Sequence, residues 1–160
     1  MRYSKLLTSV MLLLSCNLFA ATLEGKVISV ADGDTLTVMD EKKTQHKIRL
    51  QGIDAPEKDQ AYGQKSKQSL SQLVFGRDVS VDFTKKDKYG RTVGKVFLNK
   101  QDICLEQVRR GLAWHYKQYQ VEQSNDDQNL YAQAELTAKN QSIGLWKDKS
   151  PTPPWEYRKK

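Results

Sequence analysis

Three acidic side chains and an arginine are spaced so that they can act together on a phosphate. Asp34 ends the segment ADGD, and Asp54 and Glu57 belong to the segment IDAPE, which follows Arg49 closely. Two aspartate carboxylates, a backbone carbonyl and water molecules make an oxygen-only shell that suits Ca²⁺ or Mg²⁺. Glu57 is placed to take a proton from an attacking water, and Arg49 carries a planar cation that matches a phosphate. The pattern therefore indicates a hard-cation site beside a phosphate-binding arginine.

The two aspartates are expected on the core-facing side of their strands. Counting by twos along an extended strand, Asp34 shares a face with Leu36, and Asp54 shares one with Leu50. Burying a carboxylate without a partner is expensive, so each aspartate needs a cation or an arginine. The same alternation places Arg49 on the opposite face from Asp54. Both can reach one site only if the strand twists or bulges near the glycine between them.

Both acidic segments also have purely structural interpretations. ADGDT suits a tight hairpin turn with solvated carboxylates, and DAPE suits a helix start in which Asp54 is the N-cap and Glu57 reaches back. An EF-hand is excluded, because its required oxygen ligand, glycine and glutamate are replaced by Leu36, Thr37 and Lys43. The choice between a turn and a site depends on the rest of the chain.

A basic segment with an aromatic residue, KKDKYGRTVG, spans residues 85–94. As structure it is an exposed hairpin turn with solvated charges. As a functional segment it offers Tyr89 for stacking on a base and Arg91 for binding a phosphate.

The elements that must position these residues form an α+β, mainly β pattern. Alternating runs and an Asp-Gly turn predict strands, and apolar residues at helical spacing predict helices. The expected strands are residues 23–31, 35–41, 44–53, 78–83 and 92–99, and the expected helices are residues 64–76, 102–111 and 125–142. Asn125 or Asp126 is the expected cap of the last helix. This order suggests a small antiparallel barrel of the OB type with helical flanks.

The first twenty residues are typical of an export signal. Arg2 and Lys5 precede the apolar run LLTSVMLLL, and small residues predict cleavage near Ala20 or Ala21. The run is too short to span a bilayer, so no transmembrane segment is predicted. The alternative is a lipid anchor on Cys16, which ends the segment LLSC.

Residues 21–160 have the size of one domain, which ends in a Pro-rich, basic tail expected to lie over the body. Without its signal the chain has 24 Lys and Arg against 19 Asp and Glu, a net charge of +5 that suits a polyanionic partner. Cys104 then has no disulfide partner and is expected to be buried. With only His46 and His115 present, a His/Cys zinc site is not expected.

Taken together, five segments resemble the staphylococcal nuclease (thermonuclease) family in order and spacing. They are DGDT (32–35), IRLQGIDAPE (48–57), DKYGR (87–91), VRRGLA (108–113) and IGLW (143–146), and they span nearly all of the mature chain. The resemblance implies a five-stranded OB-type Greek-key barrel flanked by about three helices. It also implies a Ca²⁺-dependent endonuclease that hydrolyses DNA and RNA, with a preference for single strands, to 3′-phosphate products.

The resemblance assigns roles residue by residue. Asp34 and Asp54 match calcium ligands, and Ala55 matches a third ligand that acts through its backbone carbonyl, for which an alanine suffices. Lys88 and Tyr89 match residues that hold the nucleotide. The matching catalytic residues are Arg49, Glu57 as general base, and Arg91.

Tyr119 matches a base-stacking tyrosine, but the segment AWHYKQY departs from the family pattern. Trp114 or Tyr116 can take the same role instead.

The expected partners are DNA and RNA substrates, and the protein is predicted to be an exported monomer, periplasmic or secreted, without a stable protein partner. One alternative function is a non-catalytic nucleic-acid-binding protein on the same barrel. Three carboxylates facing a polyanion argue against it. A further alternative is a basic exported protein that adheres to envelope polymers.

Overall fold

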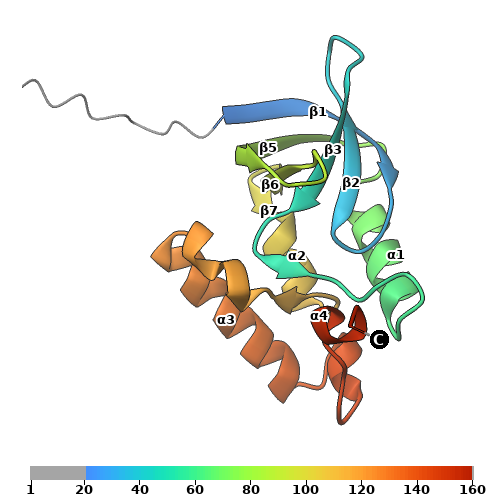
Figure 1. Cartoon of the computed structure of the whole chain (residues 1–160), viewed down its shortest axis with the longest axis vertical. Coiled ribbons are helices and arrows are strands. Elements are labelled where there is room, and N and C mark those ends of the chain that lie inside the picture. Colours follow the sequence, from blue (N-terminus) through green and yellow to red (C-terminus); the bar gives the residue numbers. More distant parts are fainter. Residues whose placement is uncertain (1–20, 160) are drawn as a thin grey trace, which may run out of the picture.

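A computed structural model describes residues 21–159, as a β-barrel with helices below it (Figure 1). The predicted export signal and Cys16 lie outside this part of the chain. The strands are β1 (Ala21–Val30), β2 (Thr35–Met39), β3 (Gln45–Leu50), β4 (Ile53–Asp54), β5 (Asp78–Lys86), β6 (Thr92–Leu98), β7 (Gln101–Asp102) and β8 (Trp114–His115). The helices are α1 (Gly63–Val74), α2 (Ile103–Arg109), α3 (Asn125–Asn140) and α4 (Pro154–Tyr157), with 3₁₀ turns η1 (Lys117–Glu122) and η2 (Gly144–Lys147).

The barrel closes through one parallel pair of strands. Its strand order is β3-β2-β1-β5-β6, with antiparallel neighbours, and β3 pairs with β6 in parallel. The expectation of an antiparallel barrel is therefore wrong for this pair. Strand direction alternates around the order, and an odd number of strands cannot close a ring without one parallel pairing. The OB-type architecture, mainly β with helices, is confirmed.

The core lies inside the barrel and under α1 and α2. Alternate residues of the strands, such as Leu36, Val38 and Ile48, are fully buried, as their period of two predicts. Cys104 of α2 is also fully buried, as expected, and burial raises the pKa of its thiol. Packing in this core thus holds the strands together. It also fixes the strand ends at which the acidic residues lie.

The three predicted helices are present, but one cap is not the expected residue. The side chain of Ser124 accepts a hydrogen bond from the N–H of Asp127 at 3.1 Å, so Ser124 caps α3. The prediction of Asn125 or Asp126 is wrong by one or two positions, because Ser124 has the extended backbone that a cap needs and its two successors are already helical. Within residues 21–159 no helix is long and apolar enough to cross a membrane.

Two of the family-like segments contact each other directly. The N–H of Leu145 donates to the carbonyl of Gly111 at 2.8 Å, which joins IGLW to VRRGLA. Trp146 then packs edge-on against Trp114, with 4.3 Å between ring centroids. These segments are therefore structural, and they fix the end of the chain that leads into α4.

A break in the third expected strand sets the geometry of the acidic segment. β3 ends at Leu50, and Gly52 has a φ of +76°, which an L side chain adopts only with strain. The chain then resumes as β4, which pairs with β8 instead of the barrel strands. This turn at Gly52 resets the alternation of side chains, so residues before and after it can face the same site.

A Gly52→Ala change tests the importance of this turn. Its Cβ would lie 2.3 Å from Nε2 of Gln123, whose Oε1 accepts a hydrogen bond from buried His115. We expect a loss in free energy of unfolding of roughly 2–4 kcal/mol, measured by urea denaturation, because strain and displacement of Gln123 add.

Gly76→Ala is the matched control. Gly76 has a φ of +75°, but no atom lies within 4 Å of the position that an added Cβ would take, so only the backbone strain of about 1–2 kcal/mol applies. Equal losses for the two variants would contradict a special role for the turn at Gly52.

Candidate active site

Asp34 is buried at the start of β2 and is held by three neighbours. Its Oδ2 accepts the N–H of Ala55 at 2.7 Å, and its Oδ1 accepts the hydroxyl of Thr35 at 3.1 Å. Its backbone carbonyl accepts the N–H of Leu50 at 2.8 Å. The hairpin end and the acidic segment are therefore joined directly, and Ala55 contacts Asp34 through its N–H.

Arg49 bridges the two buried aspartates. Its Nη2 lies 2.9 Å from Oδ1 of Asp54 and 3.2 Å from Oδ2 of Asp34. Its Nη1 donates to the carbonyls of Leu50 at 2.7 Å and Ile53 at 2.9 Å. Despite the alternation that separates them along an ideal strand, Arg49 and Asp54 thus meet, because Gly52 turns the chain between them. Both terminal nitrogens of the guanidinium are therefore hydrogen-bonded within the protein.

The charge of Arg49 does not fully balance the two carboxylates. Burial raises the pKa of Asp34 to about 7; Arg49 opposes this shift, while Asp32 and Asp54 add to it. Asp54 is only 1% exposed. The cluster therefore carries more negative charge than its own arginine can neutralise, and an added cation would be stabilised there.

Glu57 lies on a loop and does not begin a helix. Its N–H donates to Oε1 of Gln60 at 3.0 Å, and α1 begins only at Gly63. The helix-cap interpretation of DAPE is therefore wrong. The glycine and polar residues after Glu57 form turns, which leave its carboxylate partly exposed beside Asp54.

A second arginine, from the end of the chain, reaches the same carboxylates. Arg158 donates from Nη2 to Oδ2 of Asp54 at 2.7 Å and from Nη1 to Oε1 of Glu57 at 2.6 Å. The same Nη1 lies 3.3 Å from Oδ1 of Asp54. Sequence analysis missed this residue, since a basic, Pro-rich tail predicts only a strap over the body. It also missed Asp32, whose Oδ1 accepts the N–H of Asp34 at 3.1 Å.

The acidic cluster forms the floor of a cleft of about 760 Å³ with a basic rim. The rim is the β5–β6 hairpin, which contributes Lys88, Tyr89 and Arg91 to the lining. Asp87 shapes the hairpin: its Oδ1 accepts the N–H groups of Tyr89 and Arg91, each at 2.9 Å, and its Oδ2 accepts Nε of Arg91 at 2.7 Å. Although burial opposes it, these hydrogen bonds lower the pKa of Asp87, so its carboxylate stays anionic within the basic hairpin.

Three tyrosines line the cleft. Tyr89, on the hairpin, is 72% exposed, with the Arg91 guanidinium 5.4 Å and the Lys88 ammonium 5.1 Å from its ring centroid. Tyr116 and Tyr119 also line the cleft, and their rings meet edge-on at 5.1 Å. An ion pair between Lys85 of β5 and Glu122 of η1 joins the hairpin to the turn that carries Tyr119.

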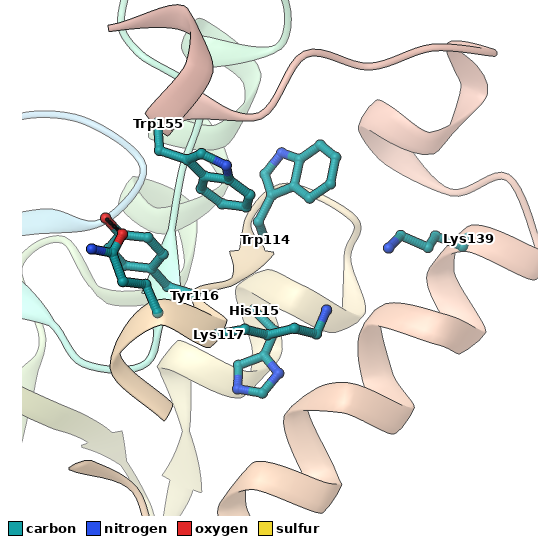
Figure 2. A pocket seen from close by; sticks show the side chains of 7 residues that line it. Trp114, His115, Tyr116, Lys117, Lys139 and Trp155 are labelled. Atoms are coloured by element: carbon teal, nitrogen blue, oxygen red, sulfur yellow. Dashed lines mark hydrogen bonds between the residues drawn. The ribbon is translucent and has the colours of Figure 1, made fainter. Parts of the chain in front are cut away.

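Trp114 does not line this cleft. It lines a separate pocket of about 250 Å³ together with Trp155, Lys117 and Lys139 (Figure 2). Tyr116 lines both spaces. Of the three residues considered for base stacking, Tyr116 and Tyr119 are therefore placed beside the acidic floor, and Trp114 is not.

The donors on the cleft floor fit a hard divalent cation. Asp34 and Asp54 present carboxylate oxygens from two adjoining segments, with no nitrogen or sulfur ligand among them. Among residues 21–159 no group of three or more His, Cys, Asp or Glu side chains is arranged to hold a metal ion. Two carboxylates with backbone oxygen and water are nevertheless sufficient for Ca²⁺ or Mg²⁺. The excess negative charge around Asp34 supports the same conclusion.

Comparison with known proteins agrees with the geometry. A family model described as "Staphylococcal nuclease homologue" matches residues 47–148, which is more than half of the chain. The chain belongs to the staphylococcal nuclease family. The match includes Arg49, Asp54, Glu57 and the basic hairpin, while Asp34 joins the site through the contacts described above.

Several relatives carry names that indicate the same activity. A protein of Haemophilus influenzae named "Uncharacterized endonuclease" is 46% identical over 134 residues, which cover 84% of this chain and 72% of that protein. One of Escherichia coli with the same name is 39% identical over 155 residues, covering 96% and 97%. A "Micrococcal nuclease" of Shigella flexneri is 35% identical over 148 residues, covering 87% and 82%. The protein is therefore a nuclease, of a family that generally depends on a metal ion.

Replacing Arg49 by lysine tests whether the hydrogen bonds of its two terminal nitrogens hold the nuclease site together. Lysine keeps the charge but has one nitrogen, so it cannot serve both aspartates and the carbonyls of Leu50 and Ile53. Urea denaturation without metal should show a loss of about 2 kcal/mol in free energy of unfolding.

Arg110→Lys provides the comparison, since Arg110 is more exposed and pairs with Glu106 of its own helix. Its loss should stay within roughly 0.5 kcal/mol. An Arg49→Lys variant as stable as Arg110→Lys would contradict the bridging role.

Proposed function

We propose that the protein is a Ca²⁺-dependent endonuclease that hydrolyses phosphodiester bonds of DNA and RNA to 3′-phosphate products and prefers single strands. The single observation that carries the proposal is the bridge between Asp34, Arg49 and Asp54 on the floor of a cleft with a basic rim. This arrangement provides a position for a cation, and the rim provides positions for the phosphates of a strand.

Asp34, Asp54 and the backbone at Ala55 are the residues proposed to hold the cation. When bound, the cation polarises a phosphoryl oxygen and neutralises part of its charge. Glu57 accepts the proton of the attacking water, because its carboxylate borders Asp54 on the cleft and is partly exposed to solvent. Burial of the two aspartates keeps their oxygens fixed while the substrate reacts.

The proposed role of Arg49 and Arg91 is to neutralise charge that develops on the phosphoryl oxygens. Arg91 is oriented for this by Asp87, which binds its Nε. Within the described residues, neither terminal nitrogen of Arg91 has a hydrogen-bond partner, so both are available to a phosphate. Arg49 holds Asp34 and Asp54 through Nη2 and two backbone carbonyls through Nη1, which fixes its positive charge on the cleft floor.

The aromatic residues of the cleft support a preference for single strands. Tyr89, Tyr116 and Tyr119 line the cleft, and each can stack on a base only when that base is unpaired. Lys88 lies beside Tyr89, where it can contact the neighbouring phosphate. Export through residues 1–20 and action as a monomer complete the proposal, and they rest on the sequence pattern and on a site formed within one chain.

The decisive assay compares cleavage of single-stranded DNA and RNA in calcium and in chelator. We expect cleavage in calcium, its loss on chelation, its recovery when calcium is restored, and 3′-phosphate ends on the products. Salt-sensitive binding without cleavage under all conditions would contradict the proposal and favour a nucleic-acid binder. Cleavage that persists in chelator would contradict the cation requirement.

A Glu57→Gln change tests the general base. The amide keeps the size of the side chain but cannot take a proton, so kcat at saturating calcium should fall at least ~10²-fold. Glu41→Gln is the control, because Glu41 is an exposed acid in the β2–β3 turn, away from the cleft. A Glu57→Gln variant with the same kcat as Glu41→Gln would exclude Glu57 as the base.

A further inference from the structure

The C-terminal arginine occupies the side of the acidic cluster that faces solvent. Both carboxylate oxygens of Asp54 have partners: Oδ1 accepts Nη2 of Arg49 at 2.9 Å, and Oδ2 accepts Nη2 of Arg158 at 2.7 Å. Arg158 also binds Oε1 of Glu57 at 2.6 Å. A cation that binds Asp54 must therefore displace an arginine, because a guanidinium and a divalent cation on one carboxylate repel each other.

The two arginines are not held equally. The side chain of Arg49 is 13% exposed, and its Nη1 is tied to two backbone carbonyls. The side chain of Arg158 is 43% exposed and, among residues 21–159, donates hydrogen bonds only to the two carboxylates. Arg158 also follows a helix of only four residues. It is therefore the arginine that can leave at lower cost.

The segment that carries Arg158 is nevertheless placed for this contact. Trp155 of α4 stacks on Tyr116, with 5.5 Å between centroids and 14° between planes, and packs edge-on against Trp114 at 5.5 Å (Figure 2). Upstream, Nε2 of Gln60 donates to the carbonyl of Thr152 at 2.6 Å. These ring contacts and this hydrogen bond hold the last turn beside the cleft even when the Arg158 side chain leaves Asp54. The ion pair between Arg158 and Asp54 can therefore form again.

We propose that in the metal-free nuclease Arg158 occupies Asp54, a ligand of the proposed cation, and pairs with Glu57 at the same time, and that a divalent cation must displace it to load the site. The inference rests on the proposed function of Asp34, Asp54 and Glu57. It adds a regulatory role to a residue that lies beyond residues 47–148, which the family model matches. While Arg158 is bound, Glu57 Oε1 is occupied as well, so one contact blocks the metal ligand and the base together.

This competition raises the cation concentration at which the nuclease becomes active. Displacing Arg158 breaks charge-assisted hydrogen bonds, and that cost is subtracted from the binding of the cation. The metal-free protein is stabilised in return, because Arg158 neutralises carboxylates that would otherwise repel each other. A nuclease made by a cell can thereby remain inactive until it meets a sufficient concentration of calcium.

The test measures calcium affinity directly, by isothermal titration in the absence of nucleic acid. Arg158→Gln removes the competing cation and should bind calcium roughly tenfold more tightly than the unchanged protein. Lys159→Gln is the matched control: it removes the same charge one residue away, but within the described chain Lys159 forms its ion pair with Glu156 and not with the acidic cluster. Its calcium affinity should not change. Circular dichroism verifies that each variant is folded.

A second measurement follows the guanidinium itself by ¹⁵N NMR. In the metal-free protein the Nη signals of Arg158, identified by their absence from Arg158→Gln, should show restricted rotation, and calcium should abolish it. Arg158→Lys keeps the positive charge but lacks the two Nη groups of the guanidinium. Its calcium affinity should lie between those of the unchanged protein and Arg158→Gln.

The possible outcomes separate this inference from the proposed function. Calcium-dependent cleavage with equal affinities for the unchanged protein and Arg158→Gln overturns the role of Arg158 alone. Weaker calcium binding by Arg158→Gln also overturns it, since Arg158 would then help to build the site. Failure of both proteins to bind calcium or to need it for cleavage overturns the proposed function and this inference together.

Discussion

The structure depends on the burial of two like-charged carboxylates at the ends of adjoining strands. Asp34 and Asp54 are 6% and 1% exposed, and burying carboxylates so deeply is costly unless positive charge lies nearby. Arg49 supplies the first part of that charge from within the barrel wall, and Arg158 supplies more from the tail. The need for positive charge beside these carboxylates makes the cluster costly to fold. The same need makes it suited to bind a divalent cation.

The barrel explains why these groups can be held so closely. Its parallel closure between β3 and β6 brings the end of β3 beside the basic hairpin, so phosphate-binding residues stand next to the acidic floor. The short pairing of β4 with β8 fixes Asp54 opposite Trp114 and places Tyr116 at the cleft. Positions far apart in the chain thus converge, and the segments that contain Gly111 and Leu145 are joined to each other by a backbone hydrogen bond.

Local patterns in the sequence predicted much of this arrangement. The alternation that put Asp34 on a core-facing side is confirmed by its burial, and the five barrel strands and three helices follow from periodicity. Asp54 is buried as expected, but the turn at Gly52 interrupts the alternation from which its burial was predicted. The conflict between Arg49 and Asp54 pointed to Gly52, whose left-handed backbone resolves it. Arg158 was out of reach, because its contact spans 104 positions and a flexible-looking tail carries no periodic signal. The cap at Ser124 was missed because neighbouring polar residues compete equally for such a position.

The central claim is that a cation binds where Asp34 and Asp54 converge and takes over from Arg158. Anomalous diffraction from crystals of the nuclease grown with calcium tests it most directly. The account predicts a calcium peak about 2.3–2.6 Å from oxygens of both aspartates, with the Arg158 side chain moved away from Asp54. A calcium peak elsewhere, or an Arg158 that still binds Asp54 when calcium occupies the cleft, would contradict the account.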